Sequence, residues 1–227
     1  MPPARVNLPV SPRFESPMTA PDPEQKHARR DPERHREALI TATLDLIAEI
    51  GVPETTVSRI IERAGLSRGM IHLHFGGKDQ LLIAAAQSFS ASFSAEMETQ
   101  LACAGDDPAD VILTAIEAEM SAPLMNERSA RIWHAFRGIA NPSPEIAHEC
   151  GTRGGLARDA LLRAFRQLAK ETRAPDPETL AQDASYGTMA LLEGVYVDYL
   201  ANTGRFSRTD ALRAIRRYLA GLFPERF

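Results

Sequence analysis

The sequence predicts an all-α protein in which a three-helix head precedes a larger helical body, with about nine helices in total. Apolar residues recur at spacings of three and four along most of the chain, and no stretch alternates convincingly as a strand. Segments rich in Pro, Gly, Asn and Asp separate the periodic stretches. The 44% apolar and 25% charged residues are typical of a globular protein with a hydrophobic core.

The first helix is expected from about Pro32 to Ile50, where leucine and isoleucine side chains share one face. Asp31 is its predicted cap, Pro32 suits the first helical position, and Gly51 ends it. The preceding residues 1–30 are expected to be a disordered, Pro-rich extension, because they contain seven prolines and no helical periodicity.

Residues 54–78 predict two short helices joined by a tight turn. Thr55 or Thr56 can cap the first helix, and Ser67 can cap the second. Gly65 lies in the turn, where its missing side chain allows a positive φ. This is the layout of a helix-turn-helix, whose second helix enters the major groove of DNA.

Several side chains of this motif could contact DNA, within a predicted DNA-binding domain of residues 31–77. Arg68 begins the second helix and can fork onto a guanine or a phosphate, although a solvated surface arginine is the alternative. Gly69 lets the backbone come close, and Met70 could meet a thymine methyl group. Hydroxyl and ring N–H groups nearby can bind phosphates. The predicted DNA-binding residues are Thr56, Ser67, Arg68, Gly69, Met70, His72, Leu73, His74 and Lys78.

A long helix is predicted from Lys78 to about Ala102, starting beside the head and ending in the body. Further helices are expected near residues 108–121, 124–140, 144–172, 177–203 and 207–222. Residues 78–227 are therefore predicted to form a second domain for effector binding and dimerisation, and the long helix could transmit motion between the two domains.

The segment from Thr56 to Leu82, TVSRIIERAGLSRGMIHLHFGGKDQLL, resembles the N-terminal signature of TetR-family transcriptional repressors. The resemblance implies a sequence-specific DNA-binding repressor that a small-molecule effector releases from its operator, with Lys78 on a phosphate. The family commonly has Tyr-His-Tyr-Phe where this chain has HLHF at residues 72–75, so the base preference cannot be copied from relatives. In particular, Leu73 replaces a polar contact by an apolar one.

Two stretches of the body, RIWHAF from Arg131 and YGTMALLEGVY from Tyr186, resemble BetI-type repressors, which are TetR-family proteins that control betaine synthesis from choline. This second resemblance implies an effector-responsive repressor, without proving that the effector is choline. A transcriptional activator on the same fold is an alternative, because the sequence does not show where the operator lies.

Trp133, the only tryptophan, could line an apolar effector pocket with other aromatic and methionine side chains. With one carboxylate, from Glu193 or Glu119, such a pocket would suit a quaternary ammonium effector through cation–π attraction. Core packing is the alternative for each of these residues. The predicted pocket residues are Met120, Met125, Trp133, Phe136, Tyr186, Glu193 and Tyr196.

The last two predicted helices each carry apolar and small residues along one stripe, which favours a four-helix bundle between two subunits. A homodimer would match a palindromic operator, because paired recognition helices need two-fold symmetry. The alternative is that both stripes are buried within one subunit. The predicted interface residues are Tyr186, Met189, Gly194, Val197, Leu212, Ile215 and Leu219.

Other classes of protein receive little support. The sequence lacks the Gly-x-Ser-x-Gly, phosphate-loop and HExxH motifs of enzymes, and no metal or cofactor is predicted. It has no run of the ~20 apolar residues that cross a membrane, and its N-terminus lacks the apolar core expected of a signal peptide. Cys103 and Cys150 do not suggest a disulfide framework, so a cytoplasmic location is the simpler prediction. A redox-sensing regulator and a helical scaffold that does not bind DNA remain alternatives.

Charge is distributed unevenly along the chain, whose formal net charge is −4. Residues 26–78 hold nine Lys or Arg against seven Asp or Glu, a net of +2, whereas residues 79–227 hold fifteen against twenty, a net of −5. An acidic body behind a mildly basic head fits a protein that meets phosphate at one end.

Overall fold

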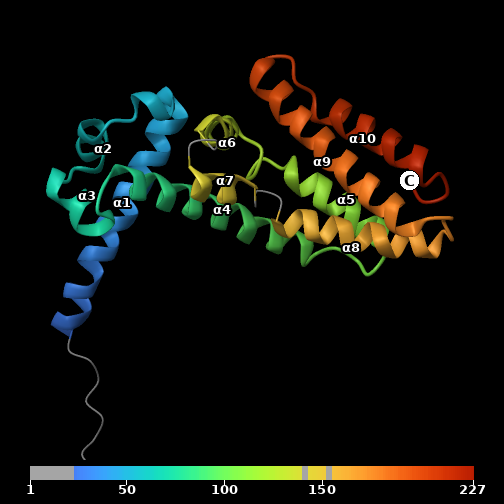
Figure 1. Cartoon of the computed structure of the whole chain (residues 1–227), viewed down its shortest axis with the longest axis horizontal. Helices are drawn as coiled ribbons and strands as arrows, with labels where there is room; N and C mark the ends of the chain where they lie inside the picture. Colours follow the sequence, from blue (N-terminus) through green and yellow to red (C-terminus); the bar gives the residue numbers. More distant parts are fainter. Residues whose placement is uncertain (1–22, 140–142, 152–154) are drawn as a thin grey trace, which may run out of the picture.

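The computed structural model describes residues 23–139, 143–151 and 155–227, which form ten helices and no strand, so the predicted all-α class is confirmed. Figure 1 shows a small head at one end of the molecule and a larger body at the other, with α4 running between them. The first four helices are α1 (Pro23–Glu54), α2 (Val57–Ala64), α3 (Arg68–Phe75) and α4 (Lys78–Leu101).

The body contains one helix more than the sequence predicted. Its remaining helices are α5 (Pro108–Glu119), α6 (Glu127–Ile139), α7 (Pro144–Gly151), α8 (Gly155–Glu171), α9 (Pro177–Ala201) and α10 (Arg208–Leu222). The single helix predicted over residues 144–172 was wrong, because α7 ends at Gly151 and α8 begins at Gly155. Residues 151–155 include three glycines, which are poor helix formers.

Helix α1 begins earlier than predicted. Residues 23–30, expected to be disordered, are helical, so Asp31 does not cap the helix and Pro32 lies inside it. Residues 24–30 are mostly good helix formers, and the proline that precedes them suits a first helical position. The rest of the predicted extension, residues 1–22, lies outside the described residues. At Gly51 the backbone leaves the helix with φ 75° and ψ 169°, a conformation that glycine adopts readily.

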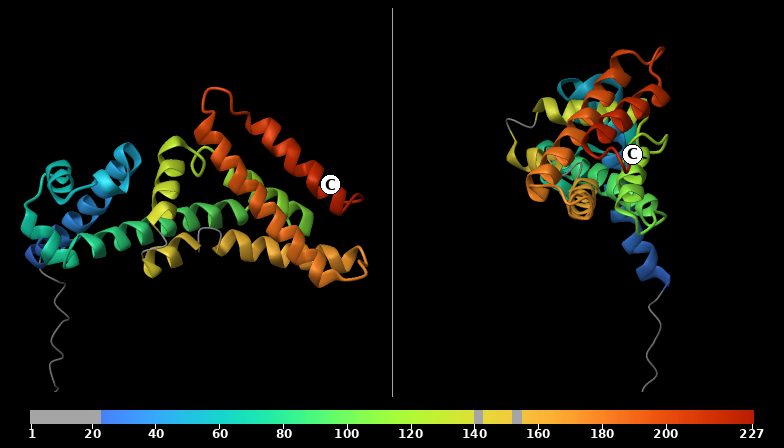
Figure 2. Two further views of the ribbon diagram at one scale, coloured as in Figure 1. Left: turned by 45° about the horizontal axis from the view of Figure 1, so that its top comes forward. Right: turned by 90° about the vertical axis from the view of Figure 1, so that its right-hand side faces the viewer.

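The head and the body have separate hydrophobic cores that share two helices. The head core consists of Leu39, Ala42, Leu46, Ile60, Ile71, Phe75, Leu81 and Ala84. Helix α1 also contributes Leu44 and Ile47 to the body core, and α4 contributes Leu82 and Ala85. The neighbours Leu81 and Leu82 therefore pack in different cores, so α4 cannot rotate without disturbing both. Figure 2 shows α4 extending from the head into the body.

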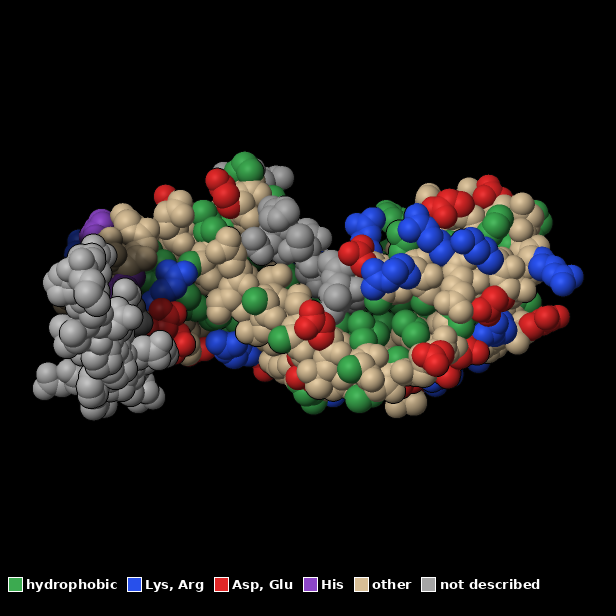
Figure 3. Space-filling view, turned by 90° about the horizontal axis from the view of Figure 1, so that it is seen from below, with side chains coloured by type: hydrophobic (Ala, Val, Ile, Leu, Met, Phe, Trp, Pro, Cys, Tyr) green, Lys and Arg blue, Asp and Glu red, His purple; other side chains and the backbone are tan. Residues whose placement is uncertain are grey.

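Ion pairs join helices over the surface of the body. On the face that Figure 3 shows, basic and acidic side chains lie close to one another over the body. Arg166 of α8 pairs with Glu178 of α9 at 2.6 Å, and Arg226 pairs with Asp107 at 2.7 Å. Hydrogen bonds from Arg166 and Gln182 lower the pKa of Glu178 to about 2.

Candidate functional site

The helix-turn-helix has the first cap and the turn that the sequence predicts. Thr56 accepts a hydrogen bond from the backbone N–H of Arg59 at 3.4 Å and so begins α2. Gly65 ends α2 with φ 65°, and the next N–H, of Leu66, donates to the carbonyl of Ile61 at 3.0 Å. These contacts fix the angle between α2 and α3.

Helix α3 begins after Ser67, whose hydroxyl makes no capping hydrogen bond, in contrast to the prediction. The carbonyl of Ser67 instead accepts from the backbone N–H of Met70 at 3.0 Å. Gly76 ends α3 with φ 76°, and the ring Nδ1 of His72 lies 3.2 Å from the Gly76 carbonyl. The ring of His72 is therefore held against the end of its own helix.

The outer face of α3 carries four of the predicted DNA-binding residues. Arg68, Gly69, His72 and Leu73 are exposed, and they lie on one side of the helix because they are spaced by one, three and four positions. Thr56 and Ser67 are also exposed, beside the starts of α2 and α3, while Lys78 is half-buried at the start of α4. The outer face of α3 is therefore open to solvent.

Two predicted DNA-binding residues are turned away from this face. Met70 is half-buried and packs against the head core. The ring of His74 lies 6.1 Å from that of His35 on α1, and its Nε2 is buried without a hydrogen-bond partner among the described residues. Both half-buried residues lie on the side of α3 that faces the rest of the head, so they present less surface than the sequence predicted.

Interactions that the sequence did not reveal attach α2 and α3 to α1. The guanidinium of Arg36 lies 4.7 Å from the centre of the Phe75 ring, a cation–π distance. Arg63 pairs with Glu49 at 2.6 Å, and this hydrogen bond lowers the pKa of Glu49. No local sequence pattern identifies these pairs, since Arg63 and Glu49 belong to different helices.

Five of the predicted pocket residues lie together inside the body. Met120, Met125, Trp133, Phe136 and Tyr196 are all buried in its core. Two aromatic rings of α4 meet Trp133 edge-on: the ring of Phe89 with a centroid distance of 5.0 Å and that of Phe93 with 5.8 Å. Those two rings also line a groove of about 470 Å³ between α1, α4 and the segment before α6.

The two candidate carboxylates differ sharply. Glu119, at the end of α5, is 1% exposed, and its backbone carbonyl accepts a hydrogen bond from the Tyr196 hydroxyl at 3.0 Å. Glu193 instead forms a surface ion pair with Arg137, which excludes it from the buried set. Tyr186 was also wrongly assigned to the pocket, because its side chain is 75% exposed on α9.

The predicted dimer residues divide into three groups. Tyr186, Gly194 and Val197 are exposed along α9, whereas Met189 and Leu212 are half-buried. Ile215 and Leu219 are buried in the core of their own subunit, so their assignment to an intersubunit contact was wrong. They belong to the inner stripe of α10, which sequence periodicity cannot distinguish from an intersubunit stripe.

The head and the body also meet through charged side chains. Arg128 of α6 donates to Asp45 of α1 at 2.6 Å. This pair lines a cleft of about 580 Å³ together with Glu49, the partner of Arg63 on α2. Ionic contacts therefore extend from α6 across α1 to the helix-turn-helix.

Comparisons with known proteins agree with this geometry. The N-terminal model of bacterial regulatory proteins of the TetR family matches residues 39–85, and the C-terminal model of BetI-type transcriptional repressors matches residues 108–224. The chain is 30% identical over 184 residues to the HTH-type transcriptional regulator BetI of Stenotrophomonas maltophilia (strain R551-3), covering 81% of this chain and 90% of that protein. It is 29% identical over 162 residues to BetI 1 of Chromohalobacter salexigens, covering 71% of this chain and 77% of that protein.

Solved structures show the same fold. A transcriptional regulator from Pseudomonas aeruginosa PAO1 is 26% identical with a TM-score of 0.75, over 90% of this chain and 97% of that one. A regulator from Saccharomonospora viridis, solved in complex with choline, is 18% identical with a TM-score of 0.69, over 82% of this chain and 96% of that one.

Among the described helices of this chain, none combines the length and apolar character required to cross a membrane. The chain belongs to the TetR family of DNA-binding transcriptional repressors, with a BetI-type C-terminal domain, and it is a regulator and not an enzyme.

Proposed function

We propose that two copies of the chain form a homodimer that places α3 of each subunit in the major groove of a palindromic operator, and that a quaternary ammonium compound releases it. The observation that carries the docking is the outer face of α3, where Arg68, Gly69, His72 and Leu73 are exposed together. Thr56, Ser67 and Lys78 lie at helix starts, where phosphates bind favourably.

The dimer proposal rests on α9. Tyr186, Leu191 and Val197 are large apolar side chains exposed on this helix, and Gly194 has no atom within 4 Å of where its Cβ would be. Burying such a face against a second copy removes apolar surface from water, and Gly194 would allow the two helices to approach closely.

The effector proposal rests on Glu119. Charged side chains are rarely buried to this extent, and Glu119 lies in the part of the core that holds Met120 and Tyr196. A carboxylate with aromatic rings nearby would suit a quaternary ammonium group, which has no N–H donor, because Coulomb attraction and cation–π contacts both act on it. The choline bound to the S. viridis regulator is a cation of this class. The groove over Phe89 and Phe93 offers an approach to the buried Trp133.

Release follows from linkage between the two sites. An effector that prefers one arrangement of α1 and α4 shifts the head, since both helices pack in both cores. The effector must then weaken DNA binding by the same factor by which DNA weakens effector binding.

Fluorescence anisotropy with labelled DNA from upstream of the coding region tests each part. Wild type should bind tightly and with strong salt dependence, and choline or betaine aldehyde should weaken binding. Arg68→Ala should lose about tenfold or more in affinity, the range for one bidentate base contact. Glu119→Gln should bind DNA normally but ignore choline, whereas the control Glu193→Gln should respond like wild type.

The results separate the parts of the proposal. If Arg68→Ala binds as well as wild type, the docking of α3 is wrong. If Glu119→Gln still responds to choline, the assignment of Glu119 as the carboxylate that binds the effector is wrong. If wild type ignores both ligands, the effector is not a quaternary ammonium compound of this kind. Sedimentation equilibrium should give a dimer in each variant, and a monomeric complex with DNA would contradict the two-fold arrangement.

A further inference from the structure

Leu73 is an apolar side chain that the head exposes to solvent. The exposed large hydrophobic residues among those described are Ile50, Leu73, Tyr186, Leu191 and Val197. Three of these lie on α9, the proposed dimer face, and Ile50 is only 39% exposed beside the break at Gly51. Leu73 is 73% exposed, on the outer face of α3.

Gly69, one helical turn before Leu73, is also unusual. Glycine inside a helix is less favourable than alanine, so its presence needs a reason. A Cβ at this position would meet only ordinary contacts, the nearest being the Ser67 hydroxyl at 3.9 Å. Nothing in the described part of the subunit therefore excludes a side chain here. The space that Gly69 leaves lies outside the protein, beside Leu73.

We propose that Leu73 packs against the C5 methyl group of a thymine in each half-site and so determines the preferred base at that position. Thymine is the base whose major-groove edge carries a methyl group, and a leucine side chain has no hydrogen-bonding atom with which to recognise another edge. Gly69 lets α3 come close enough for this contact. Met70, the residue first expected to meet thymine, packs against the head core instead.

The neighbouring polar residues favour the same arrangement. Arg68 and His72 lie on the same exposed side of α3, and the ring of His72 is held near the Gly76 carbonyl. Polar contacts to base edges or phosphates from these residues would flank an apolar contact from Leu73. The inference rests on the proposed docking of α3 in the major groove.

The test begins with selection of binding sites by the wild-type protein from a library of randomised DNA duplexes. Each thymine of the selected site is then replaced in turn by deoxyuridine, which lacks only the methyl group. Affinities are measured by fluorescence anisotropy at one salt concentration for wild type, Leu73→Ala and the control Met70→Ala. Thermal unfolding shows whether each variant is folded.

Replacing one particular thymine in each half-site by deoxyuridine should lower the affinity of wild type for the duplex about fourfold. This is the ratio expected for one buried methyl-sized group. Leu73→Ala should bind thymine and deoxyuridine equally at that position, whereas Met70→Ala should keep the fourfold difference. Indifference of wild type to every replacement, or a persistent difference in Leu73→Ala, would overturn the inference while leaving the docking intact. If no site is selected, the proposed docking fails and this inference fails with it.

Discussion

The most informative side chain of the head is exposed to solvent, whereas that of the body is buried. In the head, a small core supports α3, and the notable side chain is an apolar one outside, Leu73. In the body, a larger core contains several aromatic rings, and the notable side chain is an acidic one that is 1% exposed, Glu119. An exposed apolar side chain and a buried acidic one are both uncommon, and such positions often belong to binding sites. In the functions proposed above, the head uses an exposed residue toward DNA and the body uses a buried residue toward its effector.

The two regions are nevertheless mechanically connected. Leu81 packs in the head core and Leu82 in the body core, so one turn of α4 serves both. Asp45 and Arg128 add an ion pair between α1 and α6, although its exposure limits its contribution to stability to about 1 kcal/mol or less. The shared helices are therefore the stronger connection.

The largest expected effect is on the free energy of unfolding, and it tests whether Trp133 is a tightly packed core residue. Trp133→Ala should lower the free energy of unfolding by about 3–5 kcal/mol, because the indole is buried against Phe89 and Phe93. Leu73→Ala, an exposed site in the head, should change it by less than about 0.5 kcal/mol. Urea denaturation measures both. A loss below about 1 kcal/mol at Trp133 would show that the body core is loosely packed there.

The sequence predicts the head more completely than the body for a physical reason. Caps and turns act over a few residues, so Thr56, Gly65 and the limits of α2 and α3 follow from local chemistry. The rotation of α3 depends on its contacts with α1, and for that reason the sequence did not reveal that Met70 and His74 face the rest of the head.

The body shows the limit of periodicity as evidence. An apolar stripe identifies a buried face without identifying what covers it. The stripe with Ile215 and Leu219 is covered by its own subunit, whereas the side of α9 with Tyr186 and Val197 is left exposed. The sequence likewise offers Glu119 and Glu193 as equal candidates for the pocket carboxylate. Only the fold shows that Glu119 is buried and that Glu193 pairs with Arg137.

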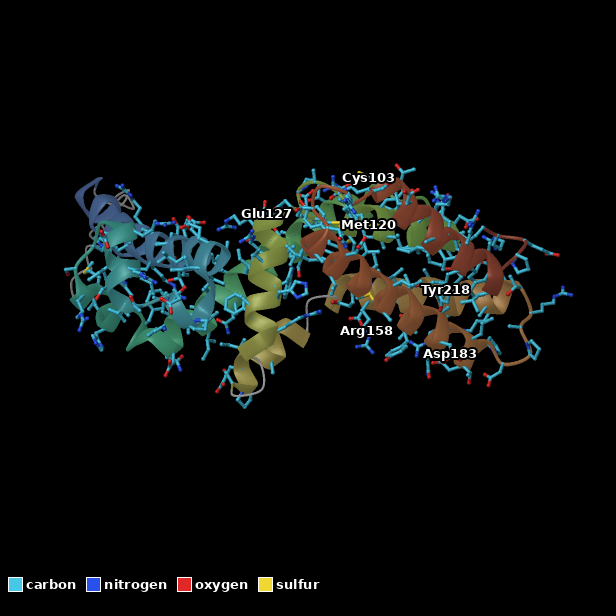
Figure 4. All side chains as sticks on the ribbon, turned by 90° about the horizontal axis from the view of Figure 1, so that it is seen from above. Cys103, Met120, Glu127, Arg158, Asp183 and Tyr218 are labelled. Carbon is cyan, nitrogen blue, oxygen red and sulfur yellow. The ribbon has the colours of Figure 1, made fainter. Side chains whose placement is uncertain are left out.

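A smaller effect should separate the inner and outer sides of α9. A Cβ at Gly187 would collide with the hydroxyl of Tyr218, which donates to the Asp183 carbonyl at 3.2 Å (Figure 4). Gly187→Ala should therefore lower the free energy of unfolding by about 1 kcal/mol, since overpacking outweighs the gain in helix propensity.

The matched control is Gly194→Ala, where no atom lies within 4 Å of the added carbon. In the isolated subunit this variant should raise the free energy of unfolding by up to about 1 kcal/mol, whereas in the proposed dimer the added methyl group would also meet the partner helix. Thermal unfolding of the two variants is therefore compared at subunit concentrations low enough to keep both monomeric. Equal effects would mean that α10 does not approach α9 closely at Gly187.

The smallest expected effect compares exposed ion pairs in the two regions as pH changes. The pKa of Glu178 is lowered to about 2 by Arg166 and Gln182 in the body, and the pKa of Glu49 is lowered by Arg63 in the head. A carboxyl group whose pKa is lower in the folded state stabilises the fold above its ordinary pKa of about 4.5, and it loses that contribution as pH falls toward the folded value.

Glu178→Gln should therefore be less stable than wild type at pH 6, and the difference should shrink between pH 4.5 and about pH 2. Glu49→Gln should show the same trend, because the hydrogen bond from Arg63 lowers the pKa of that carboxyl group. Urea midpoints at a series of pH values measure both, and a difference that stays constant down to about pH 2.5 would contradict the assignment of these pairs as ionised contacts of the folded state.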